Sequence, residues 1–502
     1  MKFVLFVLGL LIASVHSAEA DDGLYATVIT KSGAKVAEYR GIRYAQSPEK
    51  QNRWKPPVGV DGIEILNQWP PICIQDEGNR DWYQAVADGV GSDASLIPPT
   101  PEKSEDCLFL NLWRPINSKT EKLPVMVWIH GGGNVGGWSF EPNYRGHELA
   151  SDGVVVVSIG YRLNVFGFLA HPDLTAETSY LSSGNYGLLD QLEALRWVQT
   201  HIERFGGDPD NVTIFGESAG AGNVGYLIAS PLADKLFHKA IIQSGGWPIQ
   251  QTRTLKQDEV DGQAFSEKIG LGIAELRELD ATDLLEKSQK QYSRGYSALE
   301  YDPPIDDWSL PDTPAARYQH EDLPSRPVLI GINANEHLMY LADSTKTDWE
   351  TALMTVDARQ RQSVDARLEH LSYRQKIDAL YTAVDYFCDS LVTANVLAKN
   401  KSPVYFYHFR KVRAQAESLG AYHGAEIPYV FDTHDVWLPT SNADNTLTKE
   451  MMSRWTHFAK TGRPDDSGSW PRWSENNKAA LLQDRITYGA LDTQLCSIIN
   501  PD

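Results

Sequence analysis

Short apolar runs alternate along the chain with longer amphipathic segments. Two such runs flank Ser32-Gly33 and predict a β-hairpin at residues 24–29 and 35–39. Other short apolar runs predict strands at 108–112, 125–129, 154–158, 212–215, 239–243, 328–332 and 404–409. Apolar residues at helical spacing predict helices at 188–205, from 219 onward and at 450–461.

Strands that are apolar throughout, each followed by helical or loop segments, are typical of a parallel sheet covered on both faces. The pattern therefore predicts an α/β fold with a large, mostly parallel, twisted central sheet. Charged amphipathic segments at 250–320 and 340–400 predict helical insertions that form a cap. No linker divides the sequence, so we expect one domain over residues 21–502.

Residues 48–101 are dense in Pro, Gly, Asn and Asp and predict loops. Within this stretch Trp82, Tyr83, Val86 and Val90 recur at helical spacing, which indicates a short amphipathic helix. Two interpretations remain open for this helix. It is either a surface helix packed on the core or a mobile flap over a functional site.

The N-terminus has the organisation of a secretory signal peptide over residues 1–20. Lys2 precedes an apolar run at 3–15, and cleavage is expected after Ser17 or Ala20. A membrane anchor is the alternative, but the run is shorter than the ~20 residues that span a bilayer. We therefore expect a secreted or periplasmic protein without stable membrane insertion.

The charge and the cysteine content limit which partners, disulfides and metal sites are expected. The net charge is −20, from 46 basic and 66 acidic residues, which argues against nucleic acids and anionic membranes as partners. Four cysteines in an exported chain favour two disulfides, although their pairing allows three connectivities. No Cys/His spacing resembles a zinc site, and we expect neither a metal nor a cofactor.

The residues Gly216-Glu217-Ser218-Ala219-Gly220 are the strongest chemical signal. They follow the apolar run 212–215 and precede small residues, so a serine stands on a sharp turn between a strand and a helix. Upstream, His130-Gly131-Gly132-Gly133 follows the apolar run 125–129. In hydrolases such a glycine turn supplies N–H donors for the oxyanion of a tetrahedral intermediate. Together the two motifs predict a serine hydrolase.

A serine hydroxyl needs a base, and the base needs a group that orients it. His423 lies in a glycine-flanked loop after the strand at 404–409, whereas His434 and His457 are rival candidates. Glu336 follows the strand at 328–332 and is the candidate acid. Glu217 is a second candidate acid, but at the turn it is expected to point into the pocket. Activity should fall when the histidine is protonated, near an ordinary pKa of ~6.5.

The chain resembles the type-B carboxylesterase/lipase family, the cholinesterase-like branch of the α/β-hydrolases. The resemblance rests on matches in order along the sequence: Gly41-Ile42-Arg43-Tyr44-Ala45, Ser104-Glu105-Asp106-Cys107-Leu108, His130-Gly131-Gly132-Gly133, Gly187-Leu188-Leu189-Asp190-Gln191, Phe205-Gly206-Gly207-Asp208-Pro209, the serine turn, Gln243-Ser244-Gly245 and Phe458-Ala459-Lys460-Thr461-Gly462.

The resemblance implies an α/β-hydrolase fold and a catalytic triad of Ser218, Glu336 and His423. It implies an oxyanion hole from the N–H groups of Gly132, Gly133 and Ala219, with Ser244 supporting the acid. It also implies the disulfides Cys73–Cys107 and Cys388–Cys496. Two positions depart from the family: His337 follows the acid where glycine is usual, and residues 96–99 lack the aromatic side chain of cholinesterases.

The leading functional hypothesis is a serine carboxylesterase that acts on small-molecule esters through an acyl-enzyme intermediate. One alternative is a lipase in which residues 82–90 form a lid at interfaces. A more remote alternative is a non-catalytic binding or adhesion protein of the same fold. Trp138, Phe140 and Trp247 are expected in the substrate pocket, because aromatic walls suit apolar acyl or aryl groups. The chain ends soon after Cys496, so we expect no tail for tetramer assembly, and a monomer.

Overall fold

A 12-stranded sheet runs through the centre of the computed structural model, which describes residues 24–116, 122–289, 301–434, 437–474 and 478–500. The strand order is β1-β2-β4-β6-β5-β7-β8-β9-β10-β11-β12, with β3 beside β2. The strands are β1 (Ala26–Ile29), β2 (Lys35–Ala45), β3 (Gly59–Ile65), β4 (Phe109–Pro115), β5 (Leu123–Ile129), β6 (Val155–Ile159), β7 (Gly207–Glu217), β8 (Lys239–Gln243), β9 (Val328–Asn333), β10 (Val404–Phe409), β11 (Lys478–Leu482) and β12 (Ile486–Ala490).

The sheet from β6 across to β11 is parallel, whereas β1 to β4 and β12 pair antiparallel at its two edges. This confirms the mostly parallel α/β sheet. In β5, Val125 and Val127 enter one hydrophobic core, and Met126 and Trp128 enter the other. Successive side chains of a strand point to opposite faces, so a strand that is apolar throughout requires cover on both sides.

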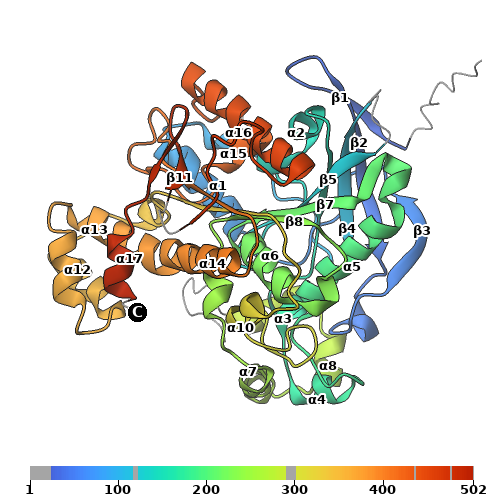
Figure 1. Ribbon diagram of the computed structural model, residues 1–502. Helices are drawn as coiled ribbons and strands as arrows, with labels where there is room; N and C mark the ends of the chain where they lie inside the picture. The colour runs from blue at the N-terminus through green and yellow to red at the C-terminus, as the bar shows by residue number, and fades with distance from the viewer. Residues whose placement is uncertain (1–23, 117–121, 290–300, 435–436, 475–477, 501–502) are drawn as a thin grey trace, which may run out of the picture.

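Helices supply that cover (Figure 1). Apolar residues of α5, α6, α10 and α14 join one core, and those of α1, α2, α15 and α16 join the other. The helices are α1 (Gly78–Gly89), α2 (His147–Ser151), α3 (Asn164–Phe168), α4 (Pro172–Ala176), α5 (Tyr186–His201), α6 (Ala219–Ala229), α7 (Leu255–Ile269), α8 (Ile273–Glu278), α9 (Ala281–Gln289), α10 (Pro314–Gln319), α11 (Lys346–Ala352), α12 (Arg361–Arg367), α13 (Tyr373–Thr382), α14 (Cys388–Lys399), α15 (Ile427–Phe431), α16 (Asn442–Thr461) and α17 (Gln494–Ile499).

The N-terminal hairpin and all seven predicted core strands are present, but three strands were not predicted. These are β3, β11 and β12, and many of their residues are exposed or half-buried, so they lack a continuous apolar run. The last long helix, α16, begins eight residues earlier than its apolar pattern indicates. Ser441 and Asp444 form a capping box there, which lets polar residues open the helix.

Within the predicted insertion at 340–400, helices α11 to α13 form a lobe with its own small core, whereas α14 joins the core of the central sheet (Figure 1). Helices α11, α12 and α13 pack there with α17 from the C-terminal end of the chain. The bridge Cys388–Cys496 joins α14 to α17, with a Cα–Cα distance of 5.3 Å. The second expected bridge, Cys73–Cys107, is also present, with a Cα–Cα distance of 5.0 Å. The predicted signal peptide and residues 290–300 of the other predicted insertion, 250–320, lie outside the described residues.

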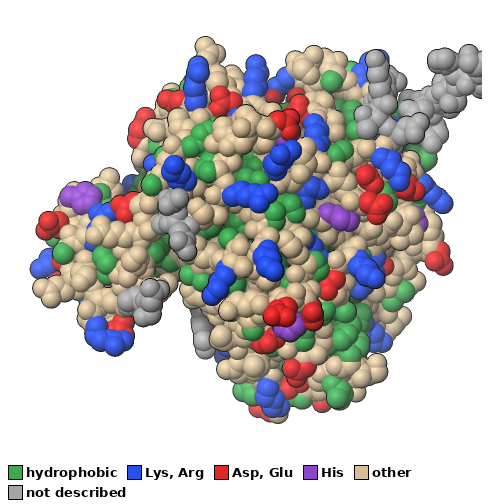
Figure 2. All heavy atoms as spheres, viewed as in Figure 1, with side chains coloured by type: hydrophobic (Ala, Val, Ile, Leu, Met, Phe, Trp, Pro, Cys, Tyr) green, Lys and Arg blue, Asp and Glu red, His purple; other side chains and the backbone are tan. Residues whose placement is uncertain are grey.

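Charged side chains of both signs are spread over the face drawn in Figure 2. Lys and Arg side chains alternate there with Asp and Glu, and no single acidic or basic area covers the face. This face therefore lacks the area of a single charge sign that a binding surface for a polyion would require.

Candidate active site

Ser218 stands alone on a tight turn between β7, which ends at Glu217, and α6, which begins at Ala219. Its backbone has φ 54° and ψ −131°, a conformation that costs free energy for a residue with a side chain. The flanking glycines make the turn possible. A Cβ on Gly220 would lie 2.0 Å from the carbonyl oxygen of Ile129, and one on Gly216 would meet the backbone of Gly220 at 2.6 Å.

The turn is also tied to the neighbouring strand, because the Ser218 N–H donates to the carbonyl oxygen of Gln243 at 2.9 Å. Ser218 lines a cavity of about 60 Å³ together with His423, Glu217, Gly131 and nine other residues: Asn79, Trp82, Gly132, Glu141, Asn143, Tyr144, Tyr340, Gly424 and Ile427. The structure therefore brings the predicted serine and histidine to one cavity.

The glycine turn after β5 borders the same cavity. Gly132 and Gly133 have φ values of 100° and 63°, which glycine adopts without strain. A Cβ on Gly131 would lie 3.0 Å from the Ser218 Cβ, so this turn abuts the serine. Among the described residues, the N–H groups of Gly132 and Gly133 find no hydrogen-bond acceptor. The N–H of Ala219, in the first turn of α6, has no acceptor within its helix.

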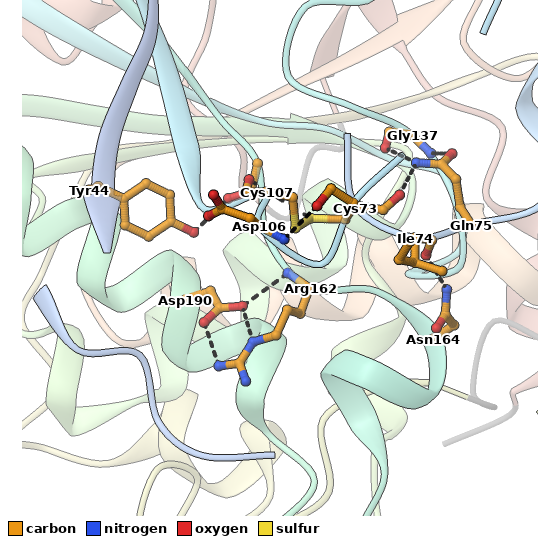
Figure 3. The surroundings of a disulfide bond; sticks show 12 residues. Tyr44, Cys73, Ile74, Gln75, Asp106, Cys107, Gly137, Arg162, Asn164 and Asp190 are labelled. Carbon is orange, nitrogen blue, oxygen red and sulfur yellow. Dashed lines mark hydrogen bonds and ion pairs between the residues drawn. A yellow bond between two sulfur atoms is a disulfide. The ribbon is translucent and has the colours of Figure 1, made fainter. Parts of the chain in front are cut away.

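The disulfide Cys73–Cys107 is linked to this turn through Gln75 (Figure 3). The Gln75 side-chain amide donates to the Cys73 carbonyl oxygen at 3.1 Å and to that of Gly137 at 2.9 Å. In return, the Gly137 N–H donates to Gln75 Oε1 at 2.8 Å. The bridge therefore anchors the loop that follows the glycine turn.

Glu336 lies in a loop after β9, residues 334–337, which we call the acid loop. Its side chain is fully buried, and its Oε2 lies 2.7 Å from His423 Nδ1. The other oxygen, Oε1, accepts from Ser244 Oγ at 2.6 Å and from the Asn333 N–H at 2.7 Å. A buried carboxylate is tolerated when hydrogen bonds replace its lost water, and these partners do so. Ser244 thus contacts the acid as the resemblance implies.

Carboxyl groups surround His423, which lies in a loop we call the histidine loop, residues 420–424. Burial lowers the pKa of His423, but Glu217, Glu336 and Glu426 outweigh burial and raise it to about 9. Glu217 Oε1 lies 3.3 Å from His423 Nε2. Burial raises the pKa of Glu217 to about 8. The pKa of His423 is therefore raised well above the ordinary value that the sequence alone suggests.

His423 Nε2, facing away from Glu336, forms no aligned hydrogen bond with any described residue. Its nearby partner is Glu217 Oε1, whose side chain also lines the cavity at Ser218.

A family model described as "Carboxylesterase family" matches residues 23–492. The chain belongs to the carboxylesterase family. The fumonisin B1 esterase of Sphingopyxis macrogoltabida is 33% identical, covering 92% of this chain and 87% of its own. The para-nitrobenzyl esterase of Bacillus subtilis is 32% identical, covering 89% of this chain and 91% of its own. The solved structure of a thermophilic PNB esterase has a TM-score of 0.80 at 29% identity, covering 94% of this chain and 97% of that chain.

Membership of the carboxylesterase family makes this chain a carboxylic ester hydrolase with the α/β-hydrolase fold.

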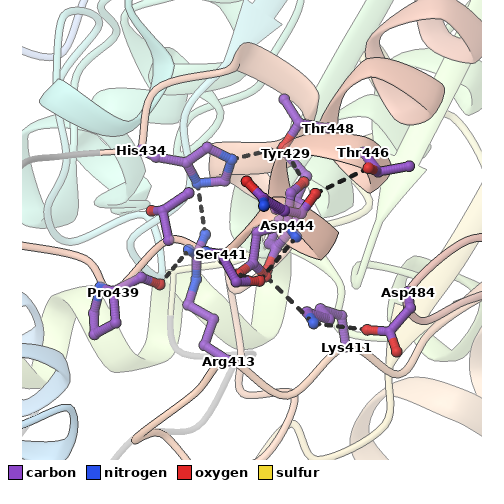
Figure 4. A network of polar contacts seen from close by, with 12 residues as sticks. Lys411, Arg413, Tyr429, His434, Pro439, Ser441, Asp444, Thr446, Thr448 and Asp484 are labelled. Atoms are coloured by element: carbon purple, nitrogen blue, oxygen red, sulfur yellow. Dashed lines mark hydrogen bonds and ion pairs between the residues drawn. The ribbon is translucent and has the colours of Figure 1, made fainter.

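The two rival histidines, His434 and His457, lie in other surroundings than His423. His434 lies between Arg413 and Thr448, at 2.8 and 2.6 Å (Figure 4). Burial and the nearby Arg413 lower its pKa to about 2. His457 is on α16, where its Nε2 lies 3.3 Å from Asp466.

Aromatic residues meet the cavity at positions that the sequence did not single out for this role. Residues 96–99 indeed lack an aromatic side chain, but Trp82 of α1 lines the cavity, as does Tyr340. Helix α1 is held there by Glu141, whose carboxylate accepts from Asn79 Nδ2 at 2.6 Å and from the Tyr83 hydroxyl at 2.9 Å. Burial raises the pKa of Glu141 to about 7.

The three aromatic residues expected in the pocket are buried outside the lining of this cavity. Trp138 and Phe140 pack in a small buried cluster with Ile72. Trp247 donates its indole N–H to Asp302 at 2.9 Å. None of the three is among the described residues that line the cavity at Ser218, and their role in substrate binding stays a prediction.

Glu426 is a site residue that sequence reasoning missed. Its buried carboxylate accepts from Gln243 Nε2 at 2.9 Å and from Asn333 Nδ2 at 2.6 Å. Burial, reinforced by the nearby Glu336, raises its pKa. In the sequence, only its position three residues after His423 could have indicated that Glu426 belongs to the site. Through these hydrogen bonds Glu426, which follows the histidine loop, connects that loop to the ends of β8 and β9.

Within the part of the chain that the structure describes, no helix has the length and apolarity to cross a membrane.

Proposed function

We propose that this carboxylesterase-family hydrolase uses Ser218 as nucleophile, His423 as general base and Glu336 as the group that orients the histidine. The observation that supports this most is the hydrogen-bonded series from Ser244 through Glu336 to His423 Nδ1, which leaves Nε2 on the side of the ring away from Glu336, in a residue that lines the cavity of Ser218. A strained serine turn adds support, because such turns are retained where a side chain must be presented.

The chemistry follows from these positions. Ser218 Oγ attacks the ester carbonyl carbon while His423 Nε2 takes the hydroxyl proton. Glu336 stabilises the imidazolium that forms, and the N–H groups of Gly132, Gly133 and Ala219 donate to the oxyanion. The tetrahedral intermediate collapses, and the departing alcohol takes the proton from His423. Water, activated by the same nitrogen, then attacks the acyl-enzyme, and the carboxylic acid and free Ser218 are released.

The small size of the cavity at Ser218 and the fixed position of α1 favour an esterase over an interfacial lipase. A lid must leave the site, yet α1 has Tyr83, Val86 and Ala87 buried and is bonded to Glu141. The cavity favours short acyl chains. The names of two relatives add fumonisin B1 and para-nitrobenzyl esters as substrates to test.

The test is hydrolysis of p-nitrophenyl esters from acetyl to palmitoyl, followed by para-nitrobenzyl esters and fumonisin B1. We expect turnover of the short esters and a loss of about 10⁴-fold or more in Ser218→Ala. Ser453→Ala, an exposed position on α16, is the matched control and should keep full activity. Activity retained in Ser218→Ala would overturn the proposal. A jump in rate above the solubility limit of a long-chain ester would favour the lipase.

We further propose that the protein is secreted or periplasmic. The two disulfides support this location, because such bridges persist in oxidising compartments. Expression of the full chain followed by N-terminal sequencing should give a mature protein that begins at Ala18 or Asp21. A cytoplasmic protein that still carries residues 1–20 would contradict export.

A further inference from the structure

The acid loop rests on one face of the helical segment formed by α13 and the π-helical turn that continues it, η9 (Ala383–Phe387). Asp378, Thr382 and Asp385 are four and three residues apart, a spacing that places their side chains on the same helical face. Each of them contacts the acid loop. This face is 40 or more residues from the loop along the chain, so tertiary packing alone brings them together.

The contacts are made to three successive residues of the acid loop. Asp378 Oδ2 accepts from Asn335 Nδ2 at 2.8 Å, and its Oδ1 accepts from the His337 N–H at 3.1 Å. Thr382 Oγ1 accepts from the Glu336 N–H at 3.0 Å and donates to Asp378 Oδ1 at 3.3 Å. Both side chains are buried, so water does not compete for these bonds. The backbone of the acid is thereby fixed on both sides and at its own N–H.

Asp385, at the outer end of the face, pairs with the residue that departs from the family pattern. His337 stands directly after the acid, and its Nε2 lies 2.9 Å from Asp385 Oδ2. The π-helical turn carrying Asp385 also carries Tyr386. The Tyr386 ring lies 5.0 Å from the His423 ring and 5.5 Å from the His337 ring, measured between centroids. π-Helical turns are rare and occur often at functional sites.

The same loop is bonded to the histidine loop. The Asn335 N–H donates to the Ala421 carbonyl oxygen at 3.1 Å, and the Ala421 N–H donates to Asn335 Oδ1 at 3.1 Å. Because Asn335 is itself held by Asp378, a shift of the helical face would move both loops. The distance between Glu336 and His423 depends on the two loops together.

We propose that Asp378, Thr382 and Asp385 form a positioning face that holds the acid loop and keeps Glu336 against His423. These three are positioning residues, since none of them lines the cavity at Ser218. The inference rests on the roles proposed above for Glu336 and His423. It adds a third element, remote from both loops in sequence, to the machinery of the reaction.

The decisive variant is Thr382→Val, which keeps the shape of the side chain and removes the hydroxyl that binds the Glu336 N–H. We expect kcat per active site to fall about 10- to 100-fold, because small misplacements of catalytic groups are costly, while KM is unchanged. Active sites are counted by titration with an organophosphonate. The acidic limb of the kcat/KM profile should also move to lower pH, because Glu336 raises the pKa of His423 less when it is displaced.

Two comparisons separate positioning from a general effect on folding. Thr382→Ser restores the hydroxyl and should restore both kcat and the pH profile. Thr456→Val is the matched control, a buried threonine on α16 whose hydroxyl donates to the Met452 carbonyl oxygen of its own helix and to Asp152, and makes no contact with the acid loop. It should lose no activity per site.

If Thr382→Val does not fold, Asp385→Asn replaces it as the test variant. The Asp385 side chain is 48% exposed, so its substitution should not prevent folding. It should change kcat and the pH profile in the same direction, to a smaller extent. The proposal is overturned if each variant that folds keeps the wild-type kcat per site and the wild-type pH profile, and only the number of active sites falls. Loss of activity in Ser218→Ala together with that result would leave the proposed function standing and remove the positioning face alone.

Discussion

Ser218 and His423 line the same cavity, but the chain holds them there in different ways. The serine half is fixed by its own backbone: the turn has a positive φ at Ser218, and Gly220 presses on the carbonyl of Ile129. The acid–histidine half is fixed by side chains from distant segments. Glu336, for example, forms hydrogen bonds with Ser244 and Thr382, which lie 92 and 46 residues away from it in the sequence.

This difference determines how each half should respond to change. A tightly packed backbone turn cannot form at all if an added atom clashes with it, because protein interiors are close-packed and the clash cannot be relieved locally. A side-chain network loses one bond at a time, and the remaining bonds still hold the group near its place. We therefore expect the serine half to fail abruptly and the acid–histidine half to fail in steps.

Gly220→Ala is the severest test of the serine half. The added Cβ would lie 2.0 Å from the Ile129 carbonyl oxygen, which belongs to a central strand and cannot move aside. We expect a loss of about 3 kcal/mol in the free energy of unfolding and complete loss of ester hydrolysis, measured by urea denaturation and p-nitrophenyl acetate turnover.

Gly270→Ala is the matched control for this clash. Gly270 ends α7 with φ 71°, and a Cβ there meets no atom within 4 Å. Only backbone strain of about 1 kcal/mol is expected, with activity unchanged. If Gly220→Ala were as mild as Gly270→Ala, the backbone turn would have spare room and the contrast between the halves would fail.

Glu336→Gln tests the acid–histidine half with a smaller expected effect. The amide keeps the size of the side chain but cannot hold the histidine tautomer and stabilise the imidazolium. We expect kcat to fall about 10³- to 10⁴-fold with KM nearly unchanged, measured by steady-state kinetics on a short ester. Folding should be retained, because the other bonds of the acid loop remain; a collapse like that of Gly220→Ala would show this half to be equally brittle.

The same contrast explains what could be predicted from the sequence. The serine turn, the glycine turn and the parallel core strands are encoded by neighbouring residues, and all were predicted. Glu336 and His423 were found from glycine or strand-end contexts, with Glu217 and two histidines left as rivals. Asp378, Thr382 and Glu426 were missed, because their contacts join segments far apart in the chain and leave no local pattern. Trp82 had been considered as part of a flap, and its place in the cavity depends on how α1 packs.

Glu217→Gln is the mildest change and tests whether the two halves are coupled electrostatically. Glu217 belongs to the serine turn, yet its Oε1 lies 3.3 Å from His423 Nε2 and its charge raises the pKa of that histidine. The histidine must be neutral to act as a base, so a raised pKa delays activity until higher pH. Removing the carboxylate lowers the pKa of His423, and the acidic limb of kcat/KM should move down by about one pH unit.

Glu217→Asp, which keeps the carboxylate, is the control and should move the acidic limb less. An unchanged limb in Glu217→Gln would mean that Glu336 and Glu426 set the pKa of His423 and that the serine half contributes geometry alone.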